Sequence, residues 1–116
     1  MKADIYIPTA NNIQALSECL ESLRQQSYKK FKVIVVGIRH DDNVQNLLNT
    51  FQDLQIQYLI QSAPGLVQAA QEAYEQADGD IFIRIDDDVV TTPDWLKHIV
   101  EIFQSHPEVG GVTGPT

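Results

Sequence analysis

Short apolar runs alternate with helically spaced apolar stripes along the whole chain. Mostly apolar runs occupy residues 3–8, 31–37, 56–60 and 80–85. Runs of this kind are typical of parallel strands that are covered on both faces of a sheet. Apolar residues recur every three or four positions, as in a helix, over residues 12–26, 44–51, 66–77 and 92–104. Strand and helix therefore repeat, and this order predicts a doubly wound α/β fold with a mainly parallel sheet.

Polar residues mark where two of the predicted helices begin. Asn11 or Asn12 precedes the first stripe and offers an amide side chain as N-cap. Thr92 and Pro93 precede the last stripe, with Thr92 as the expected N-cap and Pro93 at the first helical position. A further short apolar piece follows the last predicted helix at residues 109–112.

The segments that follow the predicted strands are where we expect a ligand site. In doubly wound sheets, ligands bind beyond the carboxyl ends of the strands, near the point where the strand order reverses. The polar tips that follow the four strands are residues 9–12, 37–42, 62–65 and 86–88.

The last of these tips holds three consecutive carboxylates, Asp86, Asp87 and Asp88. Neighbouring like charges repel one another, and a bound divalent cation would relieve that repulsion. Alternate carboxylates such as Asp86 and Asp88 can converge on one ion, and carboxylate oxygens select Mg²⁺ or Mn²⁺ over softer metals. A solvated turn that leads into the next helix is the alternative reading of the same triplet.

Charge and composition limit the partners of the chain. The 116 residues include 16 acidic and 8 basic side chains, a formal net charge of -8. The absence of a basic stripe argues against nucleic acid or an anionic membrane surface as the main partner. The single cysteine, Cys19, lies at an apolar position of a predicted helix, which favours a buried, unreactive thiol. With no paired cysteine, leader or membrane-length apolar segment, we expect a cytoplasmic location and no membrane insertion by this chain.

Five short segments stand in a fixed order along almost the whole chain. They are "YIPTANN" from residue 6, "VIVVG" from residue 33, "SAPGLVQAAQEA" from residue 62, "GDIFIRIDDDV" from residue 79 and "PDWL" from residue 93. Together they resemble the family-2 glycosyltransferases of GT-A fold. The resemblance implies a Rossmann-like three-layer α/β/α domain over residues 1–116. It further implies binding of a nucleotide-diphosphate sugar for transfer of its sugar to an unknown acceptor.

The resemblance also implies roles for individual residues. The acidic triplet is similar to the D-x-D motif of that family, so that Asp86 and Asp88 would hold Mn²⁺ or Mg²⁺ against the diphosphate. Asp86 or Asp87 would contact the ribose or the metal shell, and Thr9 would lie beside the nucleotide. The implied nucleotide-sugar-binding residues are Pro8, Thr9, Gly37, Gly65, Asp86 and Asp87.

Two departures from the family pattern affect donor recognition. The family usually has an Asp that reads the base where this chain has Gly37. Asp41 or Asp42 offers a replacement carboxylate, although the N-cap of the following helix is the favoured role for them. The family also commonly has a basic residue after the position of Gly65, where this chain has "AAQ" at residues 69–71.

A cation for the phosphates would therefore have to come from Arg39 or Arg84. We expect Arg84 to pair with the acidic triplet instead. The catalytic base of the family is expected beyond Thr116, so no residue is assigned that role, and residues 1–116 alone are expected to be inactive or incomplete. A non-catalytic nucleotide- or metal-binding module of the same fold is the alternative. A receiver-like domain is less favoured because no acidic pair follows the first strand.

Overall fold

The computed structural model describes residues 1–10, 12–62 and 65–106, which form alternating strands and helices. The strands are β1 (Ala3–Pro8), β2 (Phe31–Gly37), β3 (Ile56–Ile60) and β4 (Ile81–Arg84). The helices are α1 (Ile13–Arg24), α2 (Asp42–Asn49), α3 (Leu66–Gln76) and α4 (Trp95–Ser105). The first three predicted strands are confirmed at both ends, and the fourth loses one residue at each end. The predicted apolar piece at 109–112 and the possible cap at Asn11 lie outside the described residues.

The sheet is parallel throughout its described part, with the strand order β3-β2-β1-β4. Ile5 of β1 lies opposite Val33 of β2 and Ile83 of β4. The chain runs outward from β1 through β2 to β3 and then returns to place β4 on the other side of β1. The strand order therefore reverses between β1 and β4, and the carboxyl ends of these two strands define the switch point at which such folds bind ligands.

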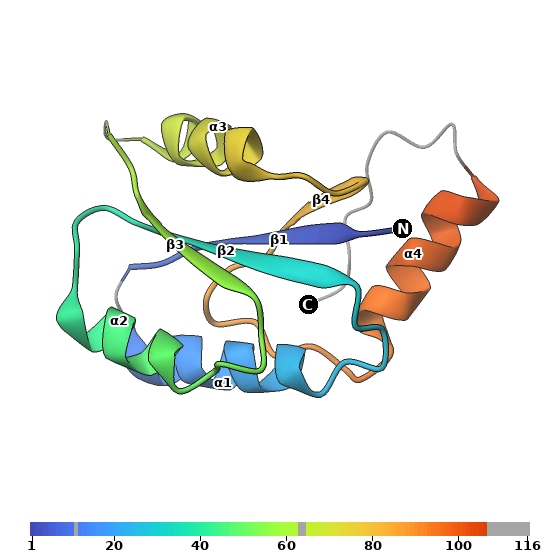
Figure 1. Cartoon of the computed structure of the whole chain (residues 1–116), viewed down its shortest axis with the longest axis horizontal. Helices are drawn as coiled ribbons and strands as arrows, with labels where there is room; N and C mark the ends of the chain where they lie inside the picture. Colours follow the sequence, from blue (N-terminus) through green and yellow to red (C-terminus); the bar gives the residue numbers. More distant parts are fainter. Residues whose placement is uncertain (11, 63–64, 107–116) are drawn as a thin grey trace.

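Helices cover both faces of the sheet, which confirms the three-layer α/β/α fold (Figure 1). Because successive strand residues point to opposite faces, odd-numbered and even-numbered positions enter different cores. The face that α1, α2 and α4 cover buries the larger core, which includes Ile5, Ile7, Val33, Val35, Leu16, Leu20, Val44 and Leu96. The face that α3 covers buries a smaller core of Tyr6, Ile34, Val36, Ala69 and Ala73.

Side-chain caps fix the first turns of α1 and α2. The Asn12 side chain accepts a hydrogen bond from the Ala15 backbone N–H at 3.2 Å. The Asp41 side chain accepts one from the Asn43 N–H at 2.8 Å. Both caps agree with the sequence, and the Asp41 cap leaves that carboxylate in a structural role.

The first turn of α4 differs from its prediction. The helix begins at Trp95, and Thr92 belongs to the preceding turn, where its carbonyl oxygen accepts a hydrogen bond from the Trp95 N–H. The predicted N-cap at Thr92 and first helical position at Pro93 are therefore wrong. The cap comes from a distant residue instead: the Gln26 side-chain oxygen accepts from the Leu96 N–H at 3.0 Å.

A buried ion pair lies at the amino-terminal ends of the strands β1 and β2. Asp4 is fully buried, and one carboxylate oxygen accepts a hydrogen bond from the Gly79 N–H at 2.6 Å. The other lies 3.8 Å from the Lys32 ammonium group, which also donates to the Gln76 carbonyl oxygen at 2.8 Å. These contacts hold the end of α3 and the start of β4 against β1 and β2.

Candidate nucleotide-sugar site

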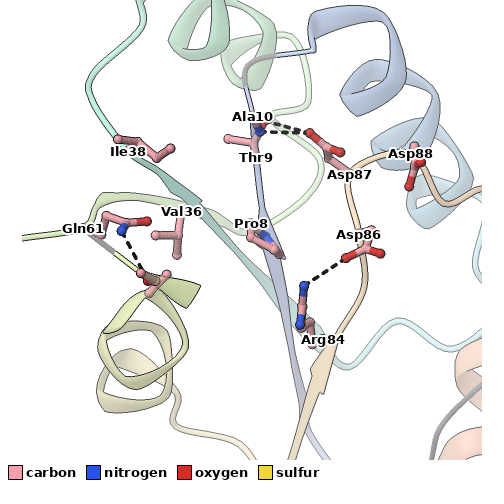
Figure 2. A pocket seen from close by; sticks show the side chains of 12 residues that line it. Pro8, Thr9, Ala10, Val36, Ile38, Gln61, Arg84, Asp86, Asp87 and Asp88 are labelled. Atoms are coloured by element: carbon pink, nitrogen blue, oxygen red, sulfur yellow. Dashed lines mark hydrogen bonds and ion pairs between the residues drawn. The ribbon is translucent and has the colours of Figure 1, made fainter. Parts of the chain in front are cut away.

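A cavity of about 430 Å³ lies at the carboxyl edge of the sheet, at the switch point between β1 and β4. Its volume falls within the range usual for small-molecule sites. Figure 2 shows how residues from separate parts of the chain surround it. They are Pro8, Thr9, Ala10, Val36, Ile38, Gln61, Gly65, Ala69, Arg84, Asp86, Asp87 and Asp88.

Side-chain alternation decides which strand residues reach the cavity. Tyr6 and Phe82 point toward α3, where their rings stack with centroids 5.9 Å apart. Two positions further along β1 and β4, Pro8 and Arg84 lie on the same side and line the cavity. Val36 follows the same alternation in β2. The period of two thus brings three strand ends to one face.

Asp87 connects the acidic loop to the end of β1. Its Oδ2 atom accepts a hydrogen bond from the Thr9 hydroxyl at 3.1 Å and another from the Ala10 N–H at 3.2 Å. Thr9 is only 5% exposed, so this contact fixes the loop against a buried part of the sheet. Asp87 therefore shapes the cavity wall through interactions within the protein.

Asp86 points instead toward Arg84 (Figure 2). The Arg84 guanidinium donates to Asp86 Oδ1 at 3.2 Å, and the two side chains are 51% and 63% exposed. This pairing agrees with the expectation from the sequence. Because both groups remain open to solvent, the ion pair contributes little to stability and exchanges easily.

A turn anchors the acidic triplet to the larger core. The Val89 N–H donates to the Asp86 carbonyl oxygen at 3.2 Å, and the Val89 side chain is buried in the larger core. Further along, the Thr91 N–H donates to the Ser22 hydroxyl at 3.0 Å. The amide of buried Gln26 donates to Thr91 Oγ1 at 2.9 Å. The C-terminal half of α1 and the residue pair that follows it thus hold the loop in place.

Cys19 lies on the buried side of this turn. Its thiol is fully buried and stands 3.9 Å from the Asp86 carbonyl oxygen. Burial, with smaller effects from the negative charges of Asp87 and Asp88, raises the pKa of the Cys19 thiol to about 12. The thiol is therefore protonated at neutral pH, as the sequence predicted for an inert cysteine.

Most residues expected at the site come together at this cavity. Among the expected binding and metal-ligating positions, those that line it are Pro8, Thr9, Gly65, Asp86, Asp87 and Asp88. Gly37 lies at the same edge, but its neighbours Val36 and Ile38 form the wall. A Cβ atom at position 37 would lie 3.4 Å from the Tyr58 hydroxyl, on the opposite face of the sheet.

Several lining residues were not expected individually from the sequence. Ile38 is 69% exposed and follows Val36 at the two-residue spacing of β2, so alternation alone was a usable signal for it. Ala10 falls within the predicted tip at residues 9–12, whereas Gln61 and Ala69 carry no comparable pattern in the sequence. Arg39, the other candidate cation for phosphates, does not line the cavity; Arg84 alone is basic among the described residues that do.

The carboxylates suit a small two-ligand cation site better than a closed protein cage. Within residues 1–10, 12–62 and 65–106, no group of three or more His, Cys, Asp or Glu side chains is arranged to hold a metal ion. Mg²⁺ and Mn²⁺ commonly use one or two carboxylates and take further oxygens from water and substrate phosphates. Exposed Asp86 and Asp88 at the cavity fit this donor chemistry.

The helix α3 adds a favourable environment for an anion. Gly65 is its N-cap, has a φ of 115° and makes no side-chain cap hydrogen bond. Gly65 and Ala69 both line the cavity, so the amino end of the helix opens onto it. The partial positive charge at this end favours a phosphate group in the cavity.

The family model for glycosyl transferase family 2 matches residues 4–115 of the chain. The chain belongs to this family. A glucosyl-dolichyl phosphate glucuronosyltransferase of Haloferax volcanii is 24% identical over 122 residues, which cover 99% of this chain and 39% of that protein. The chain spans between about a quarter and two fifths of the length of its first curated relatives, at 39%, 35% and 26%.

Solved structures of glycosyltransferases share the fold. A mannosyltransferase from Pyrobaculum calidifontis, in complex with GDP-Man and Mn²⁺, has a TM-score of 0.79 at 24% identity and covers 88% of this chain and 32% of its own. Residues 1–349 of TarS from Staphylococcus aureus, in complex with UDP-GlcNAc, have a TM-score of 0.76 at 23% identity and cover 100% of this chain and 37% of their own. These neighbours confirm the GT-A type of fold. No described helix combines the length and apolarity that a membrane span requires.

Proposed function

We propose that the cavity at the switch point binds the sugar donor of a glycosyl transfer reaction, a nucleoside diphosphate sugar. The observation that carries this proposal is the meeting of an apolar wall and an acidic loop in one cavity of suitable volume. Family membership supports the same function, because two structural neighbours are complexes with nucleotide sugars.

The two halves of the cavity suit the two halves of such a donor. Pro8, Val36 and Ile38 offer apolar surface against which a nucleoside can pack. The amino end of α3 and the Arg84 guanidinium offer positive charge for phosphate oxygens. The base is left open, since the neighbours include both a GDP-linked and a UDP-linked sugar.

Asp86 and Asp88 would hold a divalent cation, Mn²⁺ or Mg²⁺, beside the diphosphate. When bound, such an ion neutralises the negative charge that builds on the diphosphate as it leaves the sugar. The protein then has three tasks of its own at this site. Asp87 holds the acidic loop against Thr9 and Ala10. The turn at Val89 fixes the position of that loop. The apolar wall excludes water from the nucleoside.

Isothermal titration calorimetry tests this function directly. UDP and GDP are each titrated into the chain with Mn²⁺ and, in parallel, with a chelator. We expect one of the two diphosphates to bind with one-to-one stoichiometry in Mn²⁺ and at least tenfold more weakly in chelator, because an ion held by Asp86 and Asp88 would attract the diphosphate. Binding of neither diphosphate at millimolar concentration would contradict the proposal.

A further inference from the structure

We propose that the Arg84 guanidinium exchanges partners when ligands bind. In the ligand-free protein it pairs with the Asp86 carboxylate. When a divalent ion binds that carboxylate, the guanidinium moves to the donor diphosphate. This inference rests on the proposed function and adds a residue-level exchange to it. In this account Arg84 contacts the donor itself, and residues 65–76 contain no basic side chain that could do so instead.

The geometry places Arg84 in the cavity lining, where it already contacts one of its two possible partners. Its Cα is in register with Tyr6, and the alternation along β4 directs its side chain to the α3 side of the sheet, where the cavity lies. From there the guanidinium reaches Asp86 Oδ1 at 3.2 Å. In Figure 2 the two side chains point toward one another, and a dashed line marks their contact.

The charge balance of the cavity explains why one cation would serve two partners in turn. Three carboxylates and a single guanidinium line the cavity among the described residues. Without a metal ion, Arg84 offsets part of the repulsion within the triplet. Once an ion with two positive charges binds at Asp86 and Asp88, Arg84 is repelled from it and becomes available to the incoming diphosphate.

The same pair is weak enough to exchange. Both side chains are about half exposed, and a solvent-exposed ion pair with a single 3.2 Å contact is held loosely. A diphosphate offers the guanidinium several oxygens and allows paired, parallel hydrogen bonds, which are stronger than the contact with Asp86. In the alternative role, Arg84 remains paired with Asp86 and orients the Asp86 carboxylate toward the metal ion.

These two roles predict opposite effects of Arg84→Gln on Mn²⁺ binding. If Arg84 competes with the ion, the variant binds Mn²⁺ alone about two- to fivefold more tightly than the wild type. If Arg84 orients Asp86, the variant binds Mn²⁺ alone more weakly. Electron paramagnetic resonance of free Mn²⁺ measures this affinity without any nucleotide.

Diphosphate binding supplies the second readout. In saturating Mn²⁺, calorimetry with UDP and GDP is expected to show roughly tenfold or greater weakening in Arg84→Gln, because charge-assisted hydrogen bonds to phosphate are lost. Arg84→Lys retains the charge without the planar fork, so an intermediate affinity is expected. Arg39→Gln removes the same charge from outside the cavity and is expected to change neither affinity.

The outcomes separate this inference from the function beneath it. Wild-type protein that binds neither UDP nor GDP in Mn²⁺ overturns the proposed function, and the exchange with it. Wild-type binding combined with weaker Mn²⁺ affinity in Arg84→Gln overturns the exchange alone. The same holds if Arg39→Gln and Arg84→Gln behave alike, because the effect is then one of net charge. Matching melting temperatures of the ligand-free variants exclude misfolding as the cause.

Discussion

The Thr9 hydroxyl donates a hydrogen bond to Asp87 Oδ2 at 3.1 Å, although 78 positions separate the two residues in the sequence. This contact joins the carboxyl ends of β1 and β4 across the switch point of the sheet. The acidic triplet is therefore divided: one carboxylate is used within the protein, and its two neighbours stay exposed to the cavity.

This division predicts different stabilities for variants of adjacent residues. Asp87→Ala removes the acceptor of the Thr9 hydroxyl and the Ala10 N–H, so we expect a loss of roughly 1–2 kcal/mol in the free energy of unfolding. Asp88→Asn relieves repulsion at an exposed position and should leave stability unchanged or slightly higher. Urea denaturation of both variants measures the difference, and equal destabilisation would show that Asp87 has no separate structural role.

Gln26 is the residue that fixes the segment after the acidic loop. Gln26→Leu leaves the Leu96 N–H without its acceptor and removes the donors to Thr91 and Thr92. We expect a loss of roughly 2–3 kcal/mol in the free energy of unfolding, because the Leu96 N–H left behind is buried and the groups on Thr91 and Thr92 were in partly buried contacts.

The neighbouring Gln25 provides the control for this prediction. Its side chain is exposed and bonds only to Glu21 among the contacts that the structure gives for it. Gln25→Leu should change stability by less than about 0.5 kcal/mol. Similar losses in both variants would contradict the assignment of Gln26 as the anchor of α4.

We expect an added methyl group to be tolerated at Gly37 but not at Gly79. At Gly79 a Cβ would lie 2.6 Å from the Lys2 carbonyl oxygen and 2.7 Å from Asp4 Oδ2, distances that the buried network cannot absorb without shifting. Gly79→Ala should therefore cost about 1–3 kcal/mol. At Gly37 the nearest atoms are 3.4 Å away, an ordinary contact, so Gly37→Ala should be well tolerated. Thermal unfolding of both variants checks the contrast.

The buried thiol of Cys19 predicts a pH dependence of stability. Its folded pKa of about 12 lies above the value near 9 of an exposed thiol. Above pH 9 the unfolded chain loses this proton while the folded chain keeps it, so the free energy of unfolding falls by up to about 1.4 kcal/mol per pH unit. The loss is confined to the window between the two pKa values.

Cys19→Ala is the matched variant for this measurement. It lacks the titrating group, so its stability should fall less steeply than that of the wild type between pH 9 and 10, below the range in which the tyrosines and lysines titrate strongly. Chemical denaturation at several pH values gives both slopes. Parallel slopes would show that the Cys19 thiol ionises freely in the folded protein.

The sequence predicted the sheet well because its strands are local, almost continuous apolar runs. The bounds of β1, β2 and β3 follow directly from where those runs meet polar or turn residues. It failed at the start of α4, because the Leu96 N–H there is capped by Gln26, which lies 70 positions earlier in the sequence. No local pattern around Thr92 carries this information.

The same difference between local sequence patterns and long-range contacts applies to the candidate site. Strand ends and the switch point place Thr9 and the acidic triplet together, as predicted. The partition of the triplet, with Asp87 bound to Thr9 and Asp86 paired with Arg84, depends on side-chain orientations that three identical letters cannot reveal. Gly37 shows the same limit, because the face to which position 37 points becomes clear only from its contact with Tyr58.

The proposed function requires Asp88 to help hold a divalent ion against a nucleoside diphosphate in this cavity. The most direct test is the melting temperature of the wild type and of Asp88→Asn, measured with UDP or GDP, with and without Mn²⁺. Lys97→Gln, at an exposed position of α4, serves as a control. We expect the diphosphate and Mn²⁺ together to stabilise the wild type and Lys97→Gln by about 2.7 kcal/mol at a hundredfold excess over the dissociation constant. The Mn²⁺-dependent part of this gain should vanish in Asp88→Asn. An equal Mn²⁺-dependent shift in Asp88→Asn, or none in the wild type, would contradict the account.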